Sequence, residues 1–353
     1  MTVQSSKAMD AAGLKRLLGE EAARLGFAAA RVTDLAPFTT TRRRALAAVG
    51  EGRMAGMPWF SPERIESAAD LRRRFSWGRS IIALAWPYSP AVSPRRPAET
   101  APGKGRVAAY ATLDPEYHAL LGERCDRLVA ALRATDPALR AKRFIDHGWA
   151  FDRAIAERAG IGFCGKNTQL ITRTAGSYVL LASIVVSAEM PADQPSRKAC
   201  GTCRECLPAC PTGALLAPGV IDAPRCISYL TIEHRGPIPL ELRPLMGTWA
   251  FGCDLCQEAC PINERLAPTP LGEPPSLDLA SCLELDDAGF ERQFAGTSIH
   301  RTGRAGLARN CAIALGNAGD AAAVPVLQRA AAADPDPVVR EAALWALDRL
   351  GAG

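Results

Sequence analysis

The chain has 353 residues, of which 48% are hydrophobic and 22% are charged, and its formal net charge is +5. This composition is ordinary for a soluble globular protein of two or three domains. No apolar run approaches the ~20 residues of a membrane-spanning helix. The N-terminus lacks the basic and apolar segments of a signal peptide, so we expect a cytoplasmic protein that is not associated with a membrane.

Helices and strands alternate over the first 190 residues. The pattern predicts helices over residues 9–26, 42–49, 114–134 and 149–159, and strands over 27–32, 81–86, 142–145 and 177–187. Gly/Pro-rich loops are predicted over 50–62 and 87–105, and a glycine-punctuated turn over 161–167. Pro115 is expected just inside the start of its helix. Such alternation indicates an α/β or α+β domain with a layered sheet over residues 1–190.

A dense cysteine module follows over residues 191–288. It begins with the spacing Cys-x2-Cys-x2-Cys-x3-Cys-Pro, which is the bacterial ferredoxin pattern for [4Fe-4S] clusters. In that pattern three close cysteines hold one cluster and the fourth reaches the other cluster. The spacing therefore assigns one cluster to Cys200, Cys203, Cys206 and Cys260, and it begins a second with Cys210, Cys253 and Cys256. A protein with this module moves single electrons.

The second cluster lacks one cysteine of the pattern, because Ala250 stands where the ferredoxin run has a ligand. A [4Fe-4S] cluster normally takes four thiolates. Cys226, between the two runs, is the first candidate for the missing ligand, and Cys282 is the second.

Two structural zinc sites are the alternative for eight clustered cysteines. Zinc ligands usually occur as separated pairs, so three cysteines within seven residues favour iron–sulfur clusters. A reducing compartment also disfavours disulfides. The four isolated cysteines are expected to be small buried hydrophobic residues: Cys125, Cys164, Cys282 and Cys311.

The C-terminal residues 289–353 read as a stack of short alanine-rich helices. Helices are predicted over 304–315, 322–333 and up to Leu350, and the stack looks like a HEAT-type repeat. Its simplest role is to cap the cluster module, and its functional alternative is a binding surface.

Basic residues gather in three places, which favours a polyanionic partner over a generally solvated surface. The three clusters are Arg72, Arg73, Arg74 and Arg79; Arg95, Arg96, Lys104 and Arg106; and Arg292, Arg301, Arg304 and Arg309.

One segment and one residue of the first domain are candidates for ligand binding or catalysis. Gly160, Gly162 and Gly165 have dinucleotide-binding spacing, but they follow a predicted helix where that motif follows a strand. Asp146 ends a predicted strand, where ligand sites of α/β folds collect, although a helix N-cap is an equally simple role.

Three long segments of the sequence carry a resemblance to a known family. Residues 152–168 (DRAIAERAGIGFCGKNT), 226–247 (CISYLTIEHRGPIPLELRPLMG) and 251–261 (FGCDLCQEACP) resemble epoxyqueuosine reductase, as does the helical tail. The order of the eight cysteines matches that family as well. The resemblance implies a cobalamin-binding catalytic domain like that of reductive dehalogenases, a ferredoxin-like module with two clusters, and a HEAT-like domain. It also implies that the enzyme reduces the epoxide of epoxyqueuosine at the tRNA wobble position, the last step of queuosine synthesis.

The resemblance also assigns roles to residues. Asp146 matches the family's proton donor, which would be kept protonated by apolar burial beside the corrin. The cobalamin is expected base-off, without a protein histidine on cobalt. The expected cobalamin-binding residues are Trp59, Asp146, Lys166, Asn167, Thr168, Ser228, Cys253 and Asp254. The expected contacts to the modified base and to tRNA phosphates are Arg153, Arg301, Arg304 and Arg309.

Three segments depart from the family pattern: residues 147–149 after the aspartate, 53–60 and 110–118. By the resemblance all three border the substrate pocket. The implied partners are tRNA and an external electron donor of flavodoxin or ferredoxin type, and the enzyme is expected to be a monomer. Two other functions fit the cysteines: a corrinoid reductase of a small molecule, and a simple electron carrier. The basic tail favours tRNA, and the ~190 residues before the cysteines disfavour a carrier.

Overall fold

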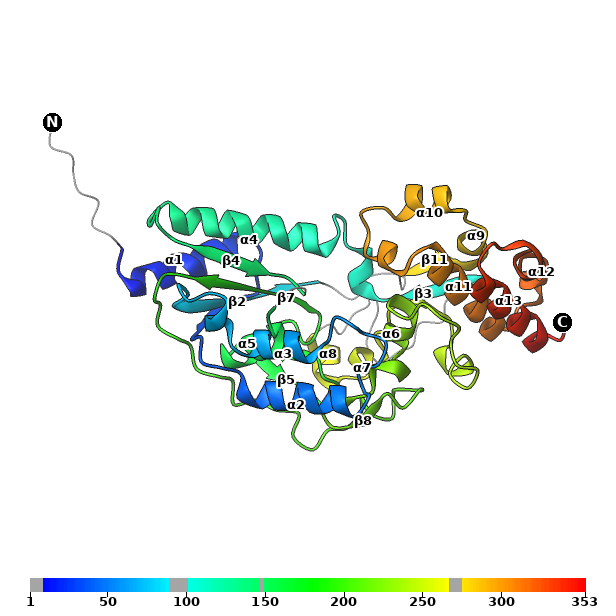
Figure 1. Cartoon of the computed structure of the whole chain (residues 1–353), viewed down its shortest axis with the longest axis horizontal. Coiled ribbons are helices and arrows are strands. Elements are labelled where there is room, and N and C mark those ends of the chain that lie inside the picture. The colour runs from blue at the N-terminus through cyan, green and yellow to red at the C-terminus, as the bar shows by residue number, and fades with distance from the viewer. Residues whose placement is uncertain (1–8, 89–100, 147–148, 267–274) are drawn as a thin grey trace.

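The computed structural model describes residues 9–88, 101–146, 149–266 and 275–353. Its elements run from a sheet domain at the N-terminus, through short helices and hairpins around the cysteines, to helices packed together at the C-terminus (Figure 1). The predicted loop 87–105 lies largely outside the described residues, as do Arg95, Arg96, His147 and Gly148.

The N-terminal domain is built on a four-stranded sheet in the order β1-β2-β7-β4. Its strands are β1 (Ala29–Thr33), β2 (Ser80–Pro87), β4 (Ala141–Phe144) and β7 (Val179–Val186). All neighbouring strands are antiparallel, with Ser183 of β7 paired to Ala83 on one side and to Phe144 on the other. The rule that ligands gather at the carboxyl ends of parallel strands therefore does not explain the position of Asp146.

Alternating side chains of β2 enter two hydrophobic cores, one on each face of the sheet. Ile82 and Leu84 pack with α1 (Ala11–Arg24) and α4 (Tyr117–Arg133). Ile81 and Ala83 pack on the opposite face with α5 (Asp152–Arg158). Figure 1 shows α4 and α5 on opposite sides of the sheet, with α2 (Thr39–Gly50) and α3 (Pro62–Ala69) on the side of α5.

Several predicted boundaries are shifted. The helix predicted from residue 114 begins at Tyr117 with Glu116 as its N-cap, so Pro115 precedes the helix. Part of the predicted turn over 161–167 is a strand, β5 (Gly162–Cys164), which pairs with β6 (Leu170–Thr172). The glycine-spaced segment does follow a helix, α5, as the sequence predicts.

A second sheet connects the first domain to the rest of the chain. Its central strand β3 (Lys104–Val107) pairs with β10 (Trp249–Phe251) and β11 (Ser276–Asp278). The cysteines lie on loops and on short elements beside it. These elements are β8 (Leu215–Ala217), β9 (Val220–Ile221), α6 (Ile227–Ile232), α7 (Leu255–Glu258), α8 (Pro261–Leu266), α9 (Leu279–Leu283) and α10 (Asp287–Phe294).

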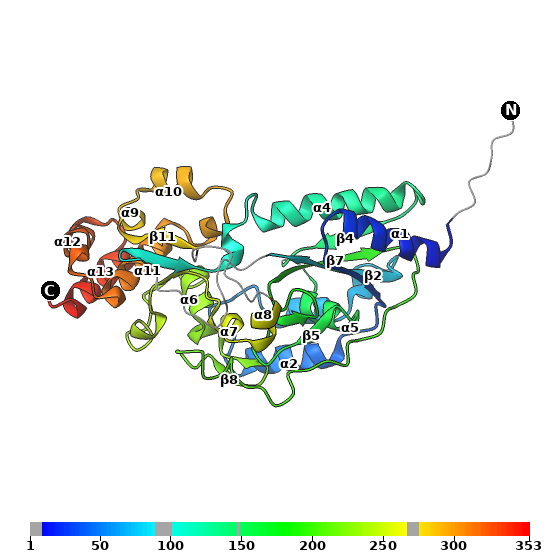
Figure 2. The ribbon, with the colours of Figure 1, turned by 180° about the vertical axis from the view of Figure 1, so that it is seen from behind.

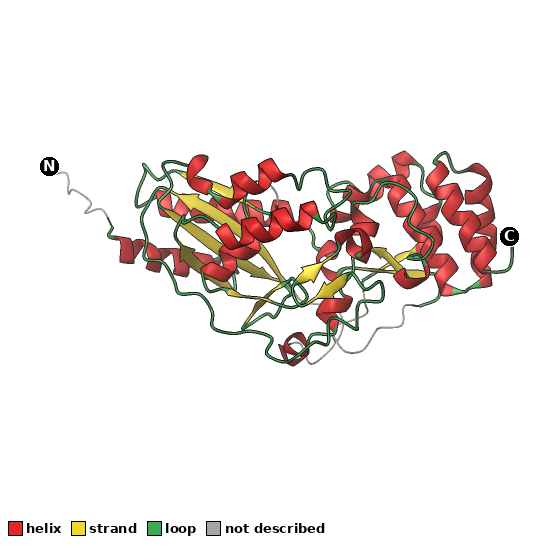
Figure 3. Ribbon diagram, turned by 60° about the horizontal axis from the view of Figure 1, so that its bottom comes forward, coloured by secondary structure: helices red, strands yellow, loops and turns green. Residues whose placement is uncertain are grey.

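The C-terminal helices are α11 (Arg304–Ala318), α12 (Val324–Ala333) and α13 (Pro337–Arg349), which confirms the predicted helical stack. α11 is buried along most of its length, and its core extends through Phe251 and Leu279 to Leu347 of α13. The helices cluster at the end of the molecule opposite the N-terminal sheet, both from behind (Figure 2) and with the bottom turned forward (Figure 3). None of the described helices is long and apolar enough to cross a membrane.

Candidate functional site

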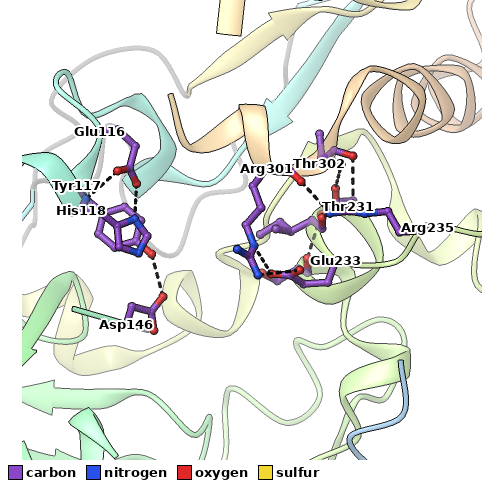
Figure 4. Close-up of polar contacts among 11 residues, drawn as sticks. Glu116, Tyr117, His118, Asp146, Thr231, Glu233, Arg235, Arg301 and Thr302 are labelled. Atoms are coloured by element: carbon purple, nitrogen blue, oxygen red, sulfur yellow. Dashed lines mark hydrogen bonds and ion pairs between the residues drawn. The ribbon is translucent and has the colours of Figure 1, made fainter. Parts of the chain in front are cut away.

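Asp146 lies directly beyond the end of β4 with its side chain exposed. The hydroxyl of Tyr117, at the start of α4, donates a hydrogen bond of 2.8 Å to Asp146 Oδ2 (Figure 4). Burial and the neighbouring Asp146 carboxylate raise the pKa of Tyr117, so this phenol remains protonated as a donor. The contact of Tyr117 with Asp146 is one that the sequence does not reveal.

A second carboxylate, Asp152 of α5, holds the backbone of Asp146. Asp152 accepts the backbone N–H of Asp146 and, at 2.5 Å, the hydroxyl of Ser183 from the central strand β7. Burial raises the pKa of Asp152 to about 7. Asp146 itself has φ +50°, a left-handed conformation that aspartate tolerates better than most side chains.

Glu116 organises the start of α4 beside this pair (Figure 4). Its carboxylate accepts the backbone N–H of His118 at 2.9 Å and contacts His118 Nδ1 at 2.8 Å. Ser298 Oγ lies 3.3 Å from the same carboxylate, which connects the first domain to the segment before α11.

Arg301 and Trp59 come together from distant parts of the chain. The Arg301 guanidinium lies 5.6 Å from the centroid of the Trp59 ring, and its Nε donates to Glu233 at 2.5 Å. Asp146 and Tyr117 both act electrostatically on Arg301. A half-exposed cation and an exposed indole therefore stand close to Asp146, at the place where the resemblance expects the cofactor and the tRNA.

The cysteines of the two runs and Cys226 lie near one another, and their electrostatic neighbours fall largely into two groups. Cys206 interacts electrostatically with Cys200, Cys260 and Cys203. The Sγ of Cys200 also accepts the backbone N–H of Lys166 at 3.4 Å. We call these four cysteines the outer set.

The remaining cysteines form an inner set. Cys256 interacts with Cys226, Cys206 and Cys210, and Cys253 interacts with Cys226 and Cys256. Burial raises the pKa of the Cys226, Cys253 and Cys256 thiols. Backbone N–H groups of Ser228 and Tyr229, in the first turn of α6, donate to the Cys226 sulfur.

The structure brings Cys226, not Cys282, to the inner set. Cys282 is buried in the core shared with the C-terminal helices, where its thiol hydrogen-bonds the thiol of Cys311. Cys125 and Cys311 are buried as predicted, whereas Cys164 is exposed on β5, so that prediction is wrong. No three described His, Cys, Asp or Glu side chains are gathered tightly enough to ligate one metal ion. A [4Fe-4S] cluster does not require such a gathering, because each thiolate binds a different iron atom.

Several residues that the resemblance assigns to cobalamin binding form hydrogen bonds with other parts of this chain. Lys166 Nζ donates to the carbonyls of Gly201 and Cys203, both at 2.7 Å, so its ammonium holds the outer cysteine loop. Asn167 is buried and donates to the Cys256 carbonyl at 3.2 Å. The Thr168 carbonyl accepts from the exposed Arg153 at 2.6 Å, and Thr168 has φ +67°.

Asp254 lies between the inner set and the Asp146 region. Its buried carboxylate accepts the backbone N–H of Ala109 at 2.7 Å and Gln257 Nε2 at 2.9 Å, and burial raises its pKa. Tyr110, next to Ala109, is acted on electrostatically by both Asp146 and Asp254. Contacts lead from here to Asp146, because the ring of Tyr110 lies 5.7 Å from that of Tyr117, which donates to Asp146.

Two residues expected to contact tRNA phosphates are instead structural. Arg309 is fully buried, and it donates to the carbonyls of Leu230, His234 and Gly236 at 2.7–2.8 Å. Arg304 has a side chain only 8% exposed and forms a bidentate pair with Asp334. The predictions for these two arginines are corrected, because a guanidinium enclosed in this way cannot reach a phosphate.

Comparison with known proteins accounts for the three parts of the chain. Residues 69–147 match the family model "Epoxyqueuosine reductase QueG, DUF1730", residues 199–263 a 4Fe-4S double cluster binding domain, and residues 299–352 HEAT repeats. The epoxyqueuosine reductase of Gloeobacter violaceus is 38% identical over 281 residues, covering 76% of this chain and 84% of the relative. That of Bacillus subtilis is 34% identical over 346 residues, covering 96% and 88%.

The chain belongs to the epoxyqueuosine reductase family. It is therefore an oxidoreductase, and residues 199–263 match an iron–sulfur double cluster domain, which favours iron–sulfur clusters over the zinc alternative. A solved epoxyqueuosine reductase bound to an epoxyqueuosine-modified tRNA-Tyr stem loop has a TM-score of 0.86 and 34% identity, covering 96% of this chain and 90% of that chain. A second solved member, from Bacillus subtilis, has a TM-score of 0.85 and 33% identity over the same shares, and its catalytic aspartate loop is swung out of the active site.

Proposed function

We propose that this protein reduces epoxyqueuosine to queuosine in tRNA, with two [4Fe-4S] clusters and base-off cobalamin as its cofactors. The observation that carries the proposal is the match, over 96% of the chain, to a family member bound to an epoxyqueuosine-modified tRNA stem loop. Conversion of the epoxide to an alkene releases its oxygen as water and consumes two electrons and two protons. When bound, cobalamin would supply a reduced nucleophilic cobalt, and the clusters would supply the electrons one at a time.

We assign the cluster ligands by the two sets. The outer cluster takes Cys200, Cys203, Cys206 and Cys260, and the inner cluster takes Cys210, Cys226, Cys253 and Cys256. Backbone N–H donation to Cys200 and Cys226 supports the assignment, because hydrogen bonds to cluster sulfurs stabilise the reduced, more negative state.

The residues around Asp146 fit a large polar cofactor. The Asp146 carboxylate is exposed, and the hydroxyl of Tyr178 is buried without a hydrogen-bond partner among the described residues, beside Asp254. Trp59 presents an exposed indole near the same place.

Within this site Asp146 would deliver a proton to the leaving epoxide oxygen. Tyr117 orients its carboxyl group through the 2.8 Å hydrogen bond, while Asp152 and Ser183 hold the backbone. The catalytic aspartate loop of the Bacillus subtilis relative supports this role. Arg153 and Arg301, both with exposed guanidinium groups, would contact the modified base and the tRNA.

The proposal is tested on protein purified anaerobically with cobalamin. We expect about eight irons per chain, one cobalt, and conversion of epoxyqueuosine-containing tRNA to queuosine-containing tRNA. Asp146→Asn should lower turnover by a factor on the order of 10² to 10⁴ and leave the metal content unchanged. Asp348→Asn, an exposed substitution in α13, is the matched control. Full metal content without turnover on this tRNA would refute the proposed substrate.

The inner ligand set is tested in the same preparation. Cys226→Ser should lower the iron content, and Cys282→Ser should leave it near the wild-type value. The opposite result would assign the fourth inner ligand to Cys282.

A further inference from the structure

The outer cysteine loop carries a set of exposed cations. Arg197 and Lys198 precede Cys200, and Arg204 follows Cys203. We call these three residues the basic rim. No ion pair joins any of them to a carboxylate in the described part of the chain, and Glu205 is the single acid between residues 194 and 210.

Two further features are connected to the outer cysteine loop through Lys166. The Lys166 ammonium is held against the carbonyls of Gly201 and Cys203, which adds a fourth positive charge to the loop. Leu216 of β8 is 55% exposed, and the β8–β9 turn is joined to Lys166 by a backbone hydrogen bond of 2.9 Å. β8 lies at the lower edge of the molecule in both Figure 1 and Figure 2. Protein-docking surfaces combine apolar side chains with a charged, solvent-accessible rim, and the turn after Leu216 is joined to the outer cysteine loop through Lys166.

The position of the basic rim relative to the two cysteine sets indicates which set receives electrons from outside. The inner set lies next to Asp254, whose carboxylate accepts the N–H of Ala109 beside Tyr110, whereas Cys200 and Cys203 of the outer set lie on the exposed loop that carries the rim. Electrons that arrive from outside would therefore enter at the outer set, directly beneath the rim. Electron-transfer partners form small, transient interfaces whose association rate depends on complementary charge.

We propose that the basic rim is the docking surface for a small acidic protein that carries single electrons. On docking, the reduced carrier gives one electron to the outer cluster and leaves oxidised by one electron, and two such encounters supply one epoxide reduction. This inference rests on the proposed function, because epoxide reduction requires an external electron donor. A tRNA contact at the rim is the competing use of the same charges, and the test separates the two.

The test uses the holoenzyme and an acidic flavodoxin as the probe. Binding of oxidised flavodoxin is followed by the anisotropy of flavin fluorescence as ionic strength is varied. We expect the double variant Arg197→Glu/Arg204→Glu to raise the dissociation constant about tenfold at low salt, with the difference shrinking as salt screens the charges. The control Arg16→Glu/Arg127→Glu makes the same change in net charge at exposed positions of α1 and α4, and it should bind as the wild type does.

Stopped-flow bleaching of the clusters is the second reading. Reduced flavodoxin should bleach the rim variant about tenfold more slowly than the wild type, whereas photoreduced deazaflavin, a small uncharged reductant, should bleach both equally. Should the reversed variant fail to retain iron, Arg197→Gln/Arg204→Gln removes the charges without adding new ones. Flavodoxin binding and cluster bleaching are both measured without tRNA. Their outcome therefore does not depend on whether the enzyme reduces epoxyqueuosine.

Three results would overturn the inference. They are unchanged flavodoxin affinity in the rim variants, wild-type binding that does not depend on ionic strength, and rim variants that lose affinity for a tRNA stem loop but keep it for flavodoxin.

Discussion

Asp146 combines an exposed carboxylate with a left-handed backbone, φ +50°. Such a conformation costs roughly 1–3 kcal/mol and persists where surrounding contacts enforce it. Here Asp152 accepts the backbone N–H of Asp146, and Ser183 in the centre of the sheet anchors Asp152. The position of Asp146 beyond β4 could be predicted from the sequence, but Tyr117 and Asp152 could not be assigned as its partners, because both contacts depend on how α4 and α5 pack on the sheet.

Asp152 makes the stability of the first domain depend on pH. Its folded pKa of about 7 is above the ordinary value near 4, so the folded state binds its proton more tightly than the unfolded state does. The shift therefore contributes at most ~4 kcal/mol to the free energy of unfolding. This contribution is fully present below about pH 4 and is lost as the pH rises through about 7. Asp152→Asn removes the titration, so the variant should gain stability relative to the wild type between pH 5 and pH 8.

The measurement is the difference in thermal unfolding midpoint between Asp152→Asn and the wild type across that range. A difference that rises with pH supports the account. A difference independent of pH would show that Asp152 is not buried as a neutral acid. Asp348→Asn, at an exposed site in α13, should show no trend.

The arginines of the C-terminal segment show that clustered positive charge in a sequence does not distinguish exposed from buried arginines. Arg301, Arg304 and Arg309 lie within nine residues of one another, yet their surroundings differ completely. Arg301 has a side chain 56% exposed, whereas Arg309 is enclosed by backbone carbonyls from the segment around α6. A clustered arginine has the same sequence signature whether it serves a phosphate or a buried carbonyl.

This contrast predicts opposite results for two identical substitutions. Arg301→Met should weaken tRNA binding and reduce the slope of log affinity against log salt by about one, with little change in stability. Arg309→Met should leave buried carbonyls without donors and lower stability by on the order of 3 kcal/mol. Salt-dependent binding of a tRNA stem loop and thermal unfolding of each variant are the two measurements. An unchanged salt slope in Arg301→Met would remove this residue from the tRNA surface.

The sequence predicts best those helices whose first and last turns carry capping residues. The helices of the tail were predicted within a few residues, because Asp336 and Pro337 form a clear N-terminus for α13 and Gly319 ends α11 in a left-handed conformation. The short strand β5 was missed because its three residues lie between glycines and pair only with the equally short β6. Pairing of this kind is set by tertiary packing.

The contact between α11 and α13 is close enough to predict the effect of a single methyl group. A Cβ at Gly316 of α11 would lie 2.8 Å from Ala346 Cβ and 2.9 Å from its Cα, which is backbone of α13. Gly316→Ala should therefore separate the helices and cost about 1–3 kcal/mol. Gly19→Ala in α1, where nothing lies within 4 Å, should stabilise by roughly 0.5–1 kcal/mol because alanine favours helix. Thermal midpoints that shift in the same direction for both variants would contradict the packing account.

At the scale of the molecule, the helical tail and the second cysteine run share one hydrophobic core. The core includes Trp249 and Phe251 of β10, which ends two residues before Cys253, together with most of α11. Asn310 of α11 donates to the carbonyls of Thr231 and Ala250, at 2.8 and 2.9 Å. The sequence identified the tail as a separate helical unit, but its fusion to the cluster module was not visible because it depends on which face of α11 is covered.

This shared core predicts what removal of the tail would do. A chain ending at Ser298 would expose the apolar face of β10 and leave the carbonyls of Thr231 and Ala250 without donors. We therefore expect low iron content, loss of a cooperative thermal transition and aggregation, not an enzyme that has lost only its affinity for tRNA. Asn310→Leu keeps the tail while removing both hydrogen bonds, and it should lower the thermal midpoint with the tail still in place. If the truncated chain retained about eight irons and a sharp transition, the tail would be a dispensable module, and its role would have to be sought in binding alone.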